Sequence, residues 1–515
     1  MSEQSHSESI SPATGKVIGE TPLHTSKDIK SAVQRIRQVQ RSWAELSFRE
    51  RGDYLRKMQR HLTEHGEEYA RVIAQDNGKS LADAYMTEIT PAIMAFDYYI
   101  KHTARVLRQR KVKGSHIFGL YTRNKLQFVP RGVIGVISPW NYPLTIPIHE
   151  ILMALMAGNG AIYKAASETQ MVGQVIQKII ASGGLPEDLF VQVNIAGRLA
   201  GDAFLNAGID KLFFTGSVPV GKILMKKASE TLTPVSLELG GNDPMIVCAE
   251  ANLKKAANGA IWAGMSNSGQ SCAGIERVYV HEAVYDEFIA ILRERLLRIK
   301  VGDPESDGIH IGTMTTARQQ ESVQRMLDDA IKAGARIAGQ SQVDKKVKQA
   351  MPATILTDVT HDMEIMQEET FGPVVGIMKF SSIDEAIDLA NDSSVGLTAS
   401  VWTTNHRLGR QIANQLEAGV VTINGHLFTH GMANLPWGGF KDSSLGRTHG
   451  EFGLQAMTET RVIVTDYLPN GLQFFWTPVS GFVYRRWVGF TMLLGGPWQV
   501  KLRGLVKLIF GLRKI

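Results

Sequence analysis

Three residues in turn-rich segments of the sequence have side chains suited to catalysis. Asn141 lies in the segment PWNYP, Glu238 in LELGG and Cys272 in GQSCAG. A reachable thiol is a nucleophile, and a carboxyl group among apolar neighbours has a raised pKa that suits a general base. An amide at the C-terminal end of a strand lies where open α/β sheets bind ligands.

Each of these residues alone also fits a structural role. Asn141 fits a proline-rich turn, Glu238 fits the surface of a strand, and a single cysteine is often a small core residue. The glycines and serine around Cys272 favour a loop with a reachable thiol, whereas Cys248 lies in an apolar run and is predicted to be core.

A fourth segment, FTGSVPVG at 214–221, is typical of a strand that turns into a helix. The free N–H groups at such a helix start can bind a pyrophosphate. The segment is not the usual three-glycine dinucleotide fingerprint, and a plain strand–helix turn remains the alternative.

The elements that must position these residues are those of an α/β fold. Residues 26–87 have the apolar stripes of helices. From residue 132, continuous apolar runs of strand length alternate with helical patterns, which predicts a parallel sheet covered on both faces. A second α/β stretch begins near residue 245, and 461–465 is a last strand candidate.

The composition excludes several classes of protein. The 515 residues are 44% hydrophobic and 21% charged, which is inconsistent with disordered, collagenous or coiled-coil chains. Two cysteines cannot form a disulfide framework or a structural zinc site, so we expect a reducing, cytoplasmic location. No secretory signal is visible at the N-terminus.

Six motifs in order show that the chain resembles the aldehyde dehydrogenase superfamily from about residue 26 to 466. Besides the four segments above, these are EETFGP at 368–373 and PWGGFK at 436–441. The resemblance implies a Rossmann-like cofactor domain, an α/β catalytic domain and a small β-arm used in oligomerisation. It predicts the following ranges: cofactor-binding domain 1–111 and 131–242, arm 112–130 and 455–466, and catalytic domain 243–454.

The resemblance also implies the catalytic roles. Cys272 is the nucleophile, Glu238 is the base that activates water, and Asn141 stabilises the oxyanion with the backbone N–H of Cys272. The implied reaction oxidises an aldehyde to the carboxylic acid through a thiohemiacetal and a thioester. The alternatives are a coenzyme A-acylating enzyme, which Glu238 disfavours, and a non-catalytic membrane-associated scaffold, which the three intact catalytic types disfavour.

The cofactor implied by the resemblance is NAD, with NADP possible. The matching positions are Trp140, Lys164, Ser167, Gly216, Ser217, Gly221, Glu369 and Phe371. Ser167 departs from the family, because it replaces an acid that would repel a 2′-phosphate. Asn242 is a second departure, at a position where many members have lysine, and it has no assigned consequence.

The C-terminal residues 467–515 lie outside the resemblance and carry all of the chain's net positive charge. They hold seven of the basic residues and no acid, whereas the whole chain has a net charge of +6. Basic residues mixed with aromatic rings are typical of membrane-interfacial segments. Its aromatic residues include Phe474, Phe475, Trp476, Phe482, Tyr484, Trp487, Phe490 and Trp498.

The end of this segment has a helical pattern, with Leu502, Leu505, Val506, Ile509 and Leu512 on one face. Prolines, glycines and an Arg pair interrupt every stretch that could span a membrane. We therefore predict peripheral membrane association and a lipophilic aldehyde such as a medium- or long-chain aliphatic one. Packing of the segment on a neighbouring subunit is the alternative.

The remaining expectations concern the pocket and partners. Trp262, Tyr142, Phe428 and Trp437 are candidates to line an apolar substrate tunnel, with ordinary packing as the alternative. We expect a homodimer or homotetramer and no nucleic-acid partner. The 14 histidines show no ligand cluster, so no metal site is predicted, and His430 is interpreted as an ordinary surface or core residue.

Overall fold

The computed structural model describes residues 6–115, 118–469 and 476–511. The chain divides into two compact units, one formed by Met1–Arg108 with Phe128–Glu459 and the other by Gln109–Gln127 with Thr460–Ile515. The expected α/β fold class is confirmed. The predicted boundary between the cofactor-binding and catalytic domains, at residue 242, falls inside the first unit and stays a prediction.

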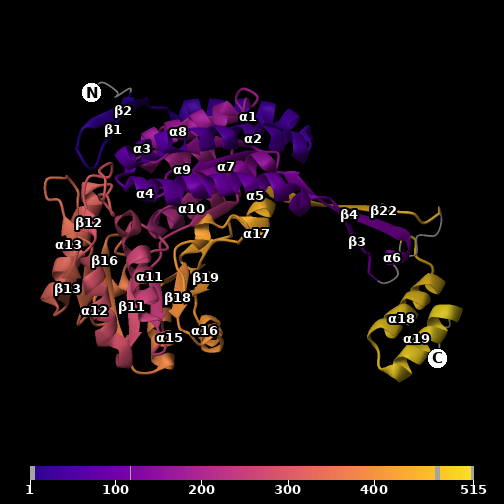
Figure 1. The fold of residues 1–515 in the computed structure, drawn as a ribbon. Helices are drawn as coiled ribbons and strands as arrows, with labels where there is room; N and C mark the ends of the chain where they lie inside the picture. Colours follow the sequence, from indigo (N-terminus) through magenta and orange to yellow (C-terminus); the bar gives the residue numbers. More distant parts are fainter. Residues whose placement is uncertain (1–5, 116–117, 470–475, 512–515) are drawn as a thin grey trace. The chain divides into compact units, whose positions relative to one another are not determined.

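The first unit contains a six-stranded sheet that holds Glu238, and the segments that form most of it are coloured purple to magenta in Figure 1. Its strands are parallel except β21, which pairs antiparallel with β9. In spatial order they are β21 (Ser444–Leu445), β9 (Val235–Glu238), β8 (Lys211–Thr215), β5 (Val133–Ile137), β6 (Gly160–Lys164) and β7 (Phe190–Val193).

Both faces of this sheet are buried, as its continuous apolar strands predict. Along β5, Val133 and Ile137 pack on one face with α1, α9 and α10, whereas Ile134 and Val136 pack on the other with α2, α3, α5, α7 and α8. These helices are α1 (Ser26–Glu45), α2 (Phe48–Glu64), α3 (Gly66–Asn77), α5 (Thr90–Leu107), α7 (Thr145–Met156), α8 (Gln170–Ser182), α9 (Gly197–Asn206) and α10 (Val218–Thr231). The helices expected within 26–87 are thus present.

A seven-stranded sheet forms the other half of the first unit, and only its edge pair β13–β15 is antiparallel. In order, the strands are β13 (Arg336–Gln340), β15 (Thr354–Thr357), β16 (Val374–Phe380), β11 (Ile275–His281), β10 (Asp243–Val247), β18 (Thr398–Trp402) and β19 (Val420–Ile423). Its helices are α11 (Leu253–Met265), α12 (Tyr285–Leu296), α13 (Ala317–Lys332), α15 (Ile383–Asn391) and α16 (His406–Ala413). Cys248 is fully buried here, in agreement with its predicted core role.

A three-stranded sheet and two helices make up most of the second unit. The sheet order is β22 (Thr458–Asp466), β4 (Thr122–Pro130) and β3 (Arg110–Val112), so the last predicted strand is present. Helices α18 (Gly481–Gly495) and α19 (Trp498–Phe510) follow, separated at the predicted Gly-Gly-Pro break.

The two C-terminal helices form a tight hairpin around two glycines. A Cβ atom on Gly489 would lie 2.6 Å from the Gly504 carbonyl oxygen, so only glycine permits this approach. The side chains of Arg485 and Arg486 donate hydrogen bonds to carbonyl oxygens near the end of α19. Phe474, Phe475 and Leu512, which belong to the predicted interfacial pattern, lie outside the described residues.

Of the helices in the described ranges, none combines the length and the apolar character that crossing a membrane requires.

Candidate active site

Two cavities of the first unit meet at Cys272. One has a volume of about 390 Å³ and an apolar lining, and the other has a volume of about 300 Å³ and a more polar lining. Cys272 is the residue that lines both, and its side chain is half-buried. We call them the apolar pocket and the polar pocket.

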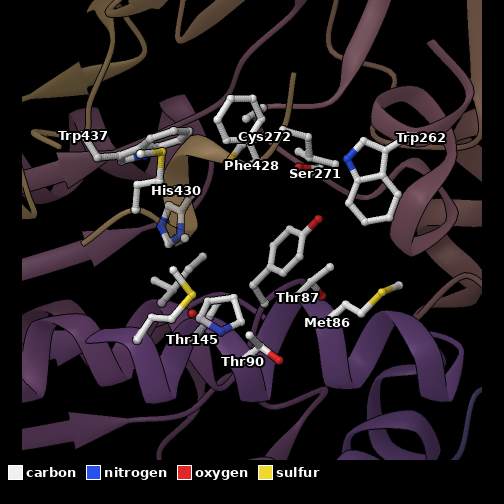
Figure 2. Close-up of a pocket in the computed structure, with 18 residues that line it drawn as sticks. Met86, Thr87, Thr90, Thr145, Trp262, Ser271, Cys272, Phe428, His430 and Trp437 are labelled. Atoms are coloured by element: carbon white, nitrogen blue, oxygen red, sulfur yellow. The ribbon is translucent and has the colours of Figure 1, made fainter. Parts of the chain in front are cut away.

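The apolar pocket contains all four aromatic residues that the sequence suggested, and Figure 2 labels Trp262, Phe428 and Trp437 among them. Tyr142, Trp262, Phe428 and Trp437 surround it together with methionines from α5 and its neighbourhood. Its described lining includes no Asp, Glu, Lys or Arg. A concave, mostly apolar site of this volume suits a small organic ligand with a hydrophobic body.

The loop that carries Cys272 has an unusual backbone. Asn267, Ser268 and Gly269 are three consecutive residues with positive φ, of 53°, 55° and 71°. Gly269 is required there, because a Cβ atom would lie 2.1 Å from the Gly372 carbonyl oxygen. Gly241 is required for a related reason, since its Cβ would lie 2.1 Å from the carbonyl oxygen of Cys272. The glycines noted in the sequence therefore allow close approach around the thiol.

Burial raises the pKa of the Cys272 thiol above its usual range, and the nearby acids Glu369, Asp243 and Glu238 raise it further. The thiol is therefore protonated at neutral pH in this arrangement. A nucleophilic role requires that its proton leave when the ligand is bound.

Asn141 is buried beside the thiol loop. Its amide Nδ2 donates a 3.1 Å hydrogen bond to the carbonyl oxygen of Gln270, which leaves one amide N–H available. Its backbone carbonyl accepts hydrogen bonds from Lys79 Nζ at 2.9 Å and from Asn267 Nδ2 at 2.8 Å. The position of Asn141 is thus fixed from two sides.

Lys79 and Glu88 form a fully buried ion pair next to the Asn141 backbone, and the sequence analysis did not predict it. Lys79 Nζ lies 2.7 Å from Glu88 Oε1, and both side chains have no solvent exposure. Glu88 Oε2 accepts backbone N–H bonds from Leu144 and Thr145 at the start of α7. The signal in the sequence was only a lysine directly after the Asn-Gly turn that ends α3.

Glu238 ends strand β9 and is 8% exposed, with neither carboxyl oxygen hydrogen-bonded. Burial raises its pKa well above the usual range, Glu150 raises it further, and Arg447 lowers it. Because no N–H group stabilises the ionised form, this carboxyl is a strong base for a glutamate. The raised pKa expected from its apolar neighbours is present.

The polar pocket gathers most of the predicted cofactor-binding residues. Those in its lining are Trp140, Gly216, Ser217, Glu369 and Phe371, and the predicted catalytic residue Asn141 also lines it. Ser217 is the N-cap of α10 and its side chain makes no capping bond, so the first N–H groups of this helix lack a side-chain acceptor. This arrangement fits a pyrophosphate at the helix start.

The loop at Glu369 closes the polar pocket. Glu369 Oε1 accepts a 3.1 Å bond from the Gly241 N–H, and burial raises its pKa to about 7. The buried Glu276 accepts the N–H groups of Thr370 and Phe371, both at 2.8 Å. Phe371 then packs edge-on against Trp140 with ring centroids 5.4 Å apart. These contacts suit a ribose and a flat aromatic ring.

Three predicted cofactor residues are not in the lining of the polar pocket. Lys164 is buried at the end of β6, and burial lowers its pKa. Ser167 is exposed, and its carbonyl oxygen accepts a bond from Gln170. Gly221 lies in α10, where a Cβ would lie 2.6 Å from Leu239 Cδ2. Asn242, the other departure, donates to the Met366 carbonyl oxygen and has no assigned consequence.

The expectation that the histidines form no cluster is wrong. His149, His430 and His449 have ligand atoms that all lie within 4.8 Å of one another. The three residues come from α7, from the turn Thr429–Gly431 and from the residue before α17 (Gly450–Ala456). They lie far apart in the sequence and only the fold brings them together, so their spacing gave no signal.

The chain matches the aldehyde dehydrogenase family over residues 1–463. It is 37% identical over 496 residues to a 4,4'-diapolycopene aldehyde oxidase of Methylomonas sp, an alignment that covers 96% of this chain and 92% of that protein. It is 34% identical over 459 residues to a putative succinate-semialdehyde dehydrogenase [NADP(+)] of Mycolicibacterium smegmatis (strain ATCC 700084 / mc(2)155), covering 89% and 88%. An alignment that covers 96% of this chain must extend beyond residue 466, into the basic segment.

Solved structures of aldehyde dehydrogenases are also similar to this chain. The NAD+ complex of an aldehyde dehydrogenase from Bacillus cereus superposes with a TM-score of 0.85 at 34% identity, covering 90% of this chain and 94% of that one. A lactaldehyde dehydrogenase from Escherichia coli gives 0.85 at 30% identity, covering 90% and 96%.

The chain therefore belongs to the aldehyde dehydrogenase family. It is an enzyme that oxidises aldehydes with a nicotinamide cofactor, NAD or NADP.

Proposed function

We propose that this enzyme oxidises a lipophilic aldehyde to its carboxylic acid through a thioester on Cys272. The observation that carries the proposal is the position of Cys272 at the junction of the apolar and polar pockets. A substrate in the first and a cofactor in the second would both reach the same sulfur.

The first step joins the aldehyde carbon to the sulfur of Cys272. The thiol proton passes to solvent water, a C–S bond forms, and the C=O π bond breaks so that the carbonyl oxygen becomes an oxyanion. The free N–H of the Asn141 amide and the backbone N–H of Cys272 are the donors available to this oxyanion. The Lys79 contact keeps the Asn141 backbone fixed, so little reorganisation is needed when charge develops.

A nicotinamide cofactor held in the polar pocket would supply the hydride acceptor, and loss of the hydride from the thiohemiacetal carbon would leave a thioester on Cys272. Glu238 then takes a proton from water, whose oxygen attacks the thioester carbon and releases the acid and the thiol. A carboxyl without hydrogen bonds and with a raised pKa suits this role. Gly216 and Ser217 would hold the pyrophosphate, and Glu369 the nicotinamide ribose.

The lining of the apolar pocket favours an uncharged substrate. A carboxylated aldehyde such as succinate semialdehyde would bring an anion into a pocket whose described lining has no Lys or Arg. Burial lowers the pKa of His430 to about 4, so that its imidazole is uncharged at neutral pH. The Methylomonas relative is named for a diapolycopene aldehyde, which agrees with this preference.

The test uses purified full-length enzyme with saturated aldehydes of increasing chain length and with succinate semialdehyde. We expect kcat/KM to rise with chain length and to be lowest for succinate semialdehyde. Cys272→Ala should abolish turnover, and Glu238→Gln should give one equivalent of reduced cofactor followed by a stalled acyl-enzyme. Wild-type rates in Cys272→Ala would overturn the mechanism, and acyl-CoA as the product would favour the acylating alternative.

We also propose that the α18–α19 hairpin attaches the enzyme to an anionic membrane surface. On α19, Trp498, Leu502, Leu505 and Ile509 are exposed and spaced three or four residues apart, so they share one face. Lys501 flanks this face, whereas Arg503 and Lys507 lie on the opposite side of the helix. Each basic residue near anionic lipid contributes on the order of 1 kcal/mol to binding.

Cosedimentation with phosphatidylserine-containing vesicles tests the attachment. Full-length protein should bind, and Leu505→Asp with Ile509→Asp should reduce binding more than the paired change of exposed Leu199 and Leu297 to Asp. Equal partitioning of full-length protein and a chain ending at Asp466 would contradict the proposal. A change of oligomeric state on truncation would instead favour packing on a neighbouring subunit.

A further inference from the structure

The three-histidine cluster lies at the wall of the apolar pocket. His430 is one of the residues that line this pocket, and Figure 2 shows its ring beside Trp437. The His430 ring centroid is 5.6 Å from that of His149 and 4.7 Å from that of His449. His149 and His449 stack with centroids 3.9 Å apart.

Two nitrogens of this cluster are buried without a hydrogen-bond partner. They are Nε2 of His149 and Nδ1 of His449. His149 is 0% exposed and His449 is 1% exposed. Buried polar atoms are normally paired, so an orphaned pair in one cluster indicates a ligand. The partner of His149 Nδ1 is the Tyr99 hydroxyl at 3.0 Å.

We propose that His149, His430 and His449 bind a divalent first-row transition-metal ion of the Zn²⁺ type. Three imidazoles without a thiolate or carboxylate form a ligand set that suits zinc, copper, nickel or iron rather than magnesium or calcium. With three protein ligands, a tetrahedral ion keeps one position for water or a substrate oxygen.

The distances allow the site to close around an ion. Zinc–nitrogen bonds of about 2.1 Å place tetrahedral ligand atoms roughly 3.4 Å apart. The ligand atoms here lie within 4.8 Å of one another, so closure needs shifts of about 1 Å. The stacked rings of His149 and His449 must also turn relative to each other, because an imidazole binds an ion in the plane of its ring. His430 is the least buried of the three and can move toward the ion by side-chain rotation.

The protonation state of the cluster also suits an ion. A neutral imidazole carries its proton on one ring nitrogen and offers the lone pair of the other. When His149 Nδ1–H donates to the Tyr99 oxygen, Nε2 is left as the unprotonated nitrogen. Hydrogen bonds of this kind orient metal-bound histidines in known sites.

The experiment measures Zn²⁺ binding to chelator-treated full-length enzyme, with Co²⁺ as a spectroscopic probe. Cys272→Ser is run in parallel, because the nearby thiol could bind the ion by itself. We expect one ion per chain in both proteins, and a Co²⁺ spectrum that indicates tetrahedral nitrogen ligands without thiolate charge transfer.

Variants then locate the ion. His430→Ala should weaken affinity at least about 100-fold, and Tyr99→Phe, which removes only the orienting hydroxyl, about 10- to 100-fold. His449→Asn provides a second ligand deletion, because asparagine tolerates the positive φ of 58° at this position. His406→Ala, at an exposed histidine on α16, is the matched control and should bind as the parent does.

Loss of binding in Cys272→Ser together with unchanged binding in His430→Ala would overturn the proposal, because the ion would then lie on the thiol. Failure of the parent enzyme to bind Zn²⁺ with a Kd below about 10 µM would also overturn it. Anomalous scattering at the zinc edge, with a peak between the three rings, is the expected direct result.

Discussion

The change Lys79→Met removes a buried cation, and we expect it to lower both the free energy of unfolding and kcat. Lys79 Nζ bonds to Glu88 Oε1 at 2.7 Å and to the Asn141 carbonyl at 2.9 Å, with no solvent exposure. Breaking a fully buried ion pair from one side typically costs about 3–5 kcal/mol. We expect a loss of this size in the free energy of unfolding, measured by urea denaturation.

The matched control is the double variant Lys79→Met with Glu88→Gln. It leaves no buried charge, so it should recover a large part of the lost stability. It does not restore the bond to Asn141, so kcat should stay low in both variants if this bond positions the oxyanion donor. A double variant that is less stable than the single one would contradict the reasoning.

The pH dependence gives an independent check on the same pair. Burial raises the pKa of Glu88 in the folded protein, and Lys79 lowers it. Without the lysine, this folded-state pKa is raised further above the unfolded value of about 4.3. The variant therefore loses stability relative to the parent as pH rises, by up to about 1.4 kcal/mol per pH unit. A deficit that shrinks between pH 6 and pH 8 would refute the account.

Three further predictions concern the site directly. Gly241→Ala should lower kcat about 100-fold, because its Cβ would displace the Cys272 carbonyl by an ångström or more, whereas Gly197→Ala, with nothing closer than 4.0 Å, should not. The rate of acid formation should rise with pH through the raised pKa of Glu238, since only the ionised form is a base, and the residual rate of Glu238→Gln should lack this rise. Ser167→Glu should lower the ratio of kcat/KM for NADP to that for NAD at least about tenfold through charge repulsion; an unchanged ratio would show that position 167 does not contact the phosphate.

The sequence predicted the layers of the fold well, because parallel strands buried on both faces are continuous apolar runs. The runs at 133–137 and 245–247 became central strands for this reason. The reactive residues were also visible, since Cys272 and Glu238 lie beside glycines that close packing requires. Each of these signals comes from residues that are neighbours in the chain, so a single sequence is enough to show it.

Contacts between distant segments could not be predicted in this way. Lys79 and Glu88 have the residue types of solvated surface charges, and only the packing of α7 over them makes them a buried pair. The three histidines lie at positions 149, 430 and 449, a spacing without any helical or strand period. Their closeness is a property of the folded chain alone.

The neighbouring acid Glu150 affects the pKa of Glu238 and thus its strength as a base. Burial raises the pKa of Glu150 to about 8, so this neighbour is largely protonated at neutral pH. Its hydrogen bond is with Thr448, and none is made to Glu238. Glu150 raises the pKa of Glu238 when it is ionised, so this increase is smaller at neutral pH than above the pKa of Glu150. Neither carboxyl oxygen of Glu238 accepts a hydrogen bond, so its ionised form is a strong base.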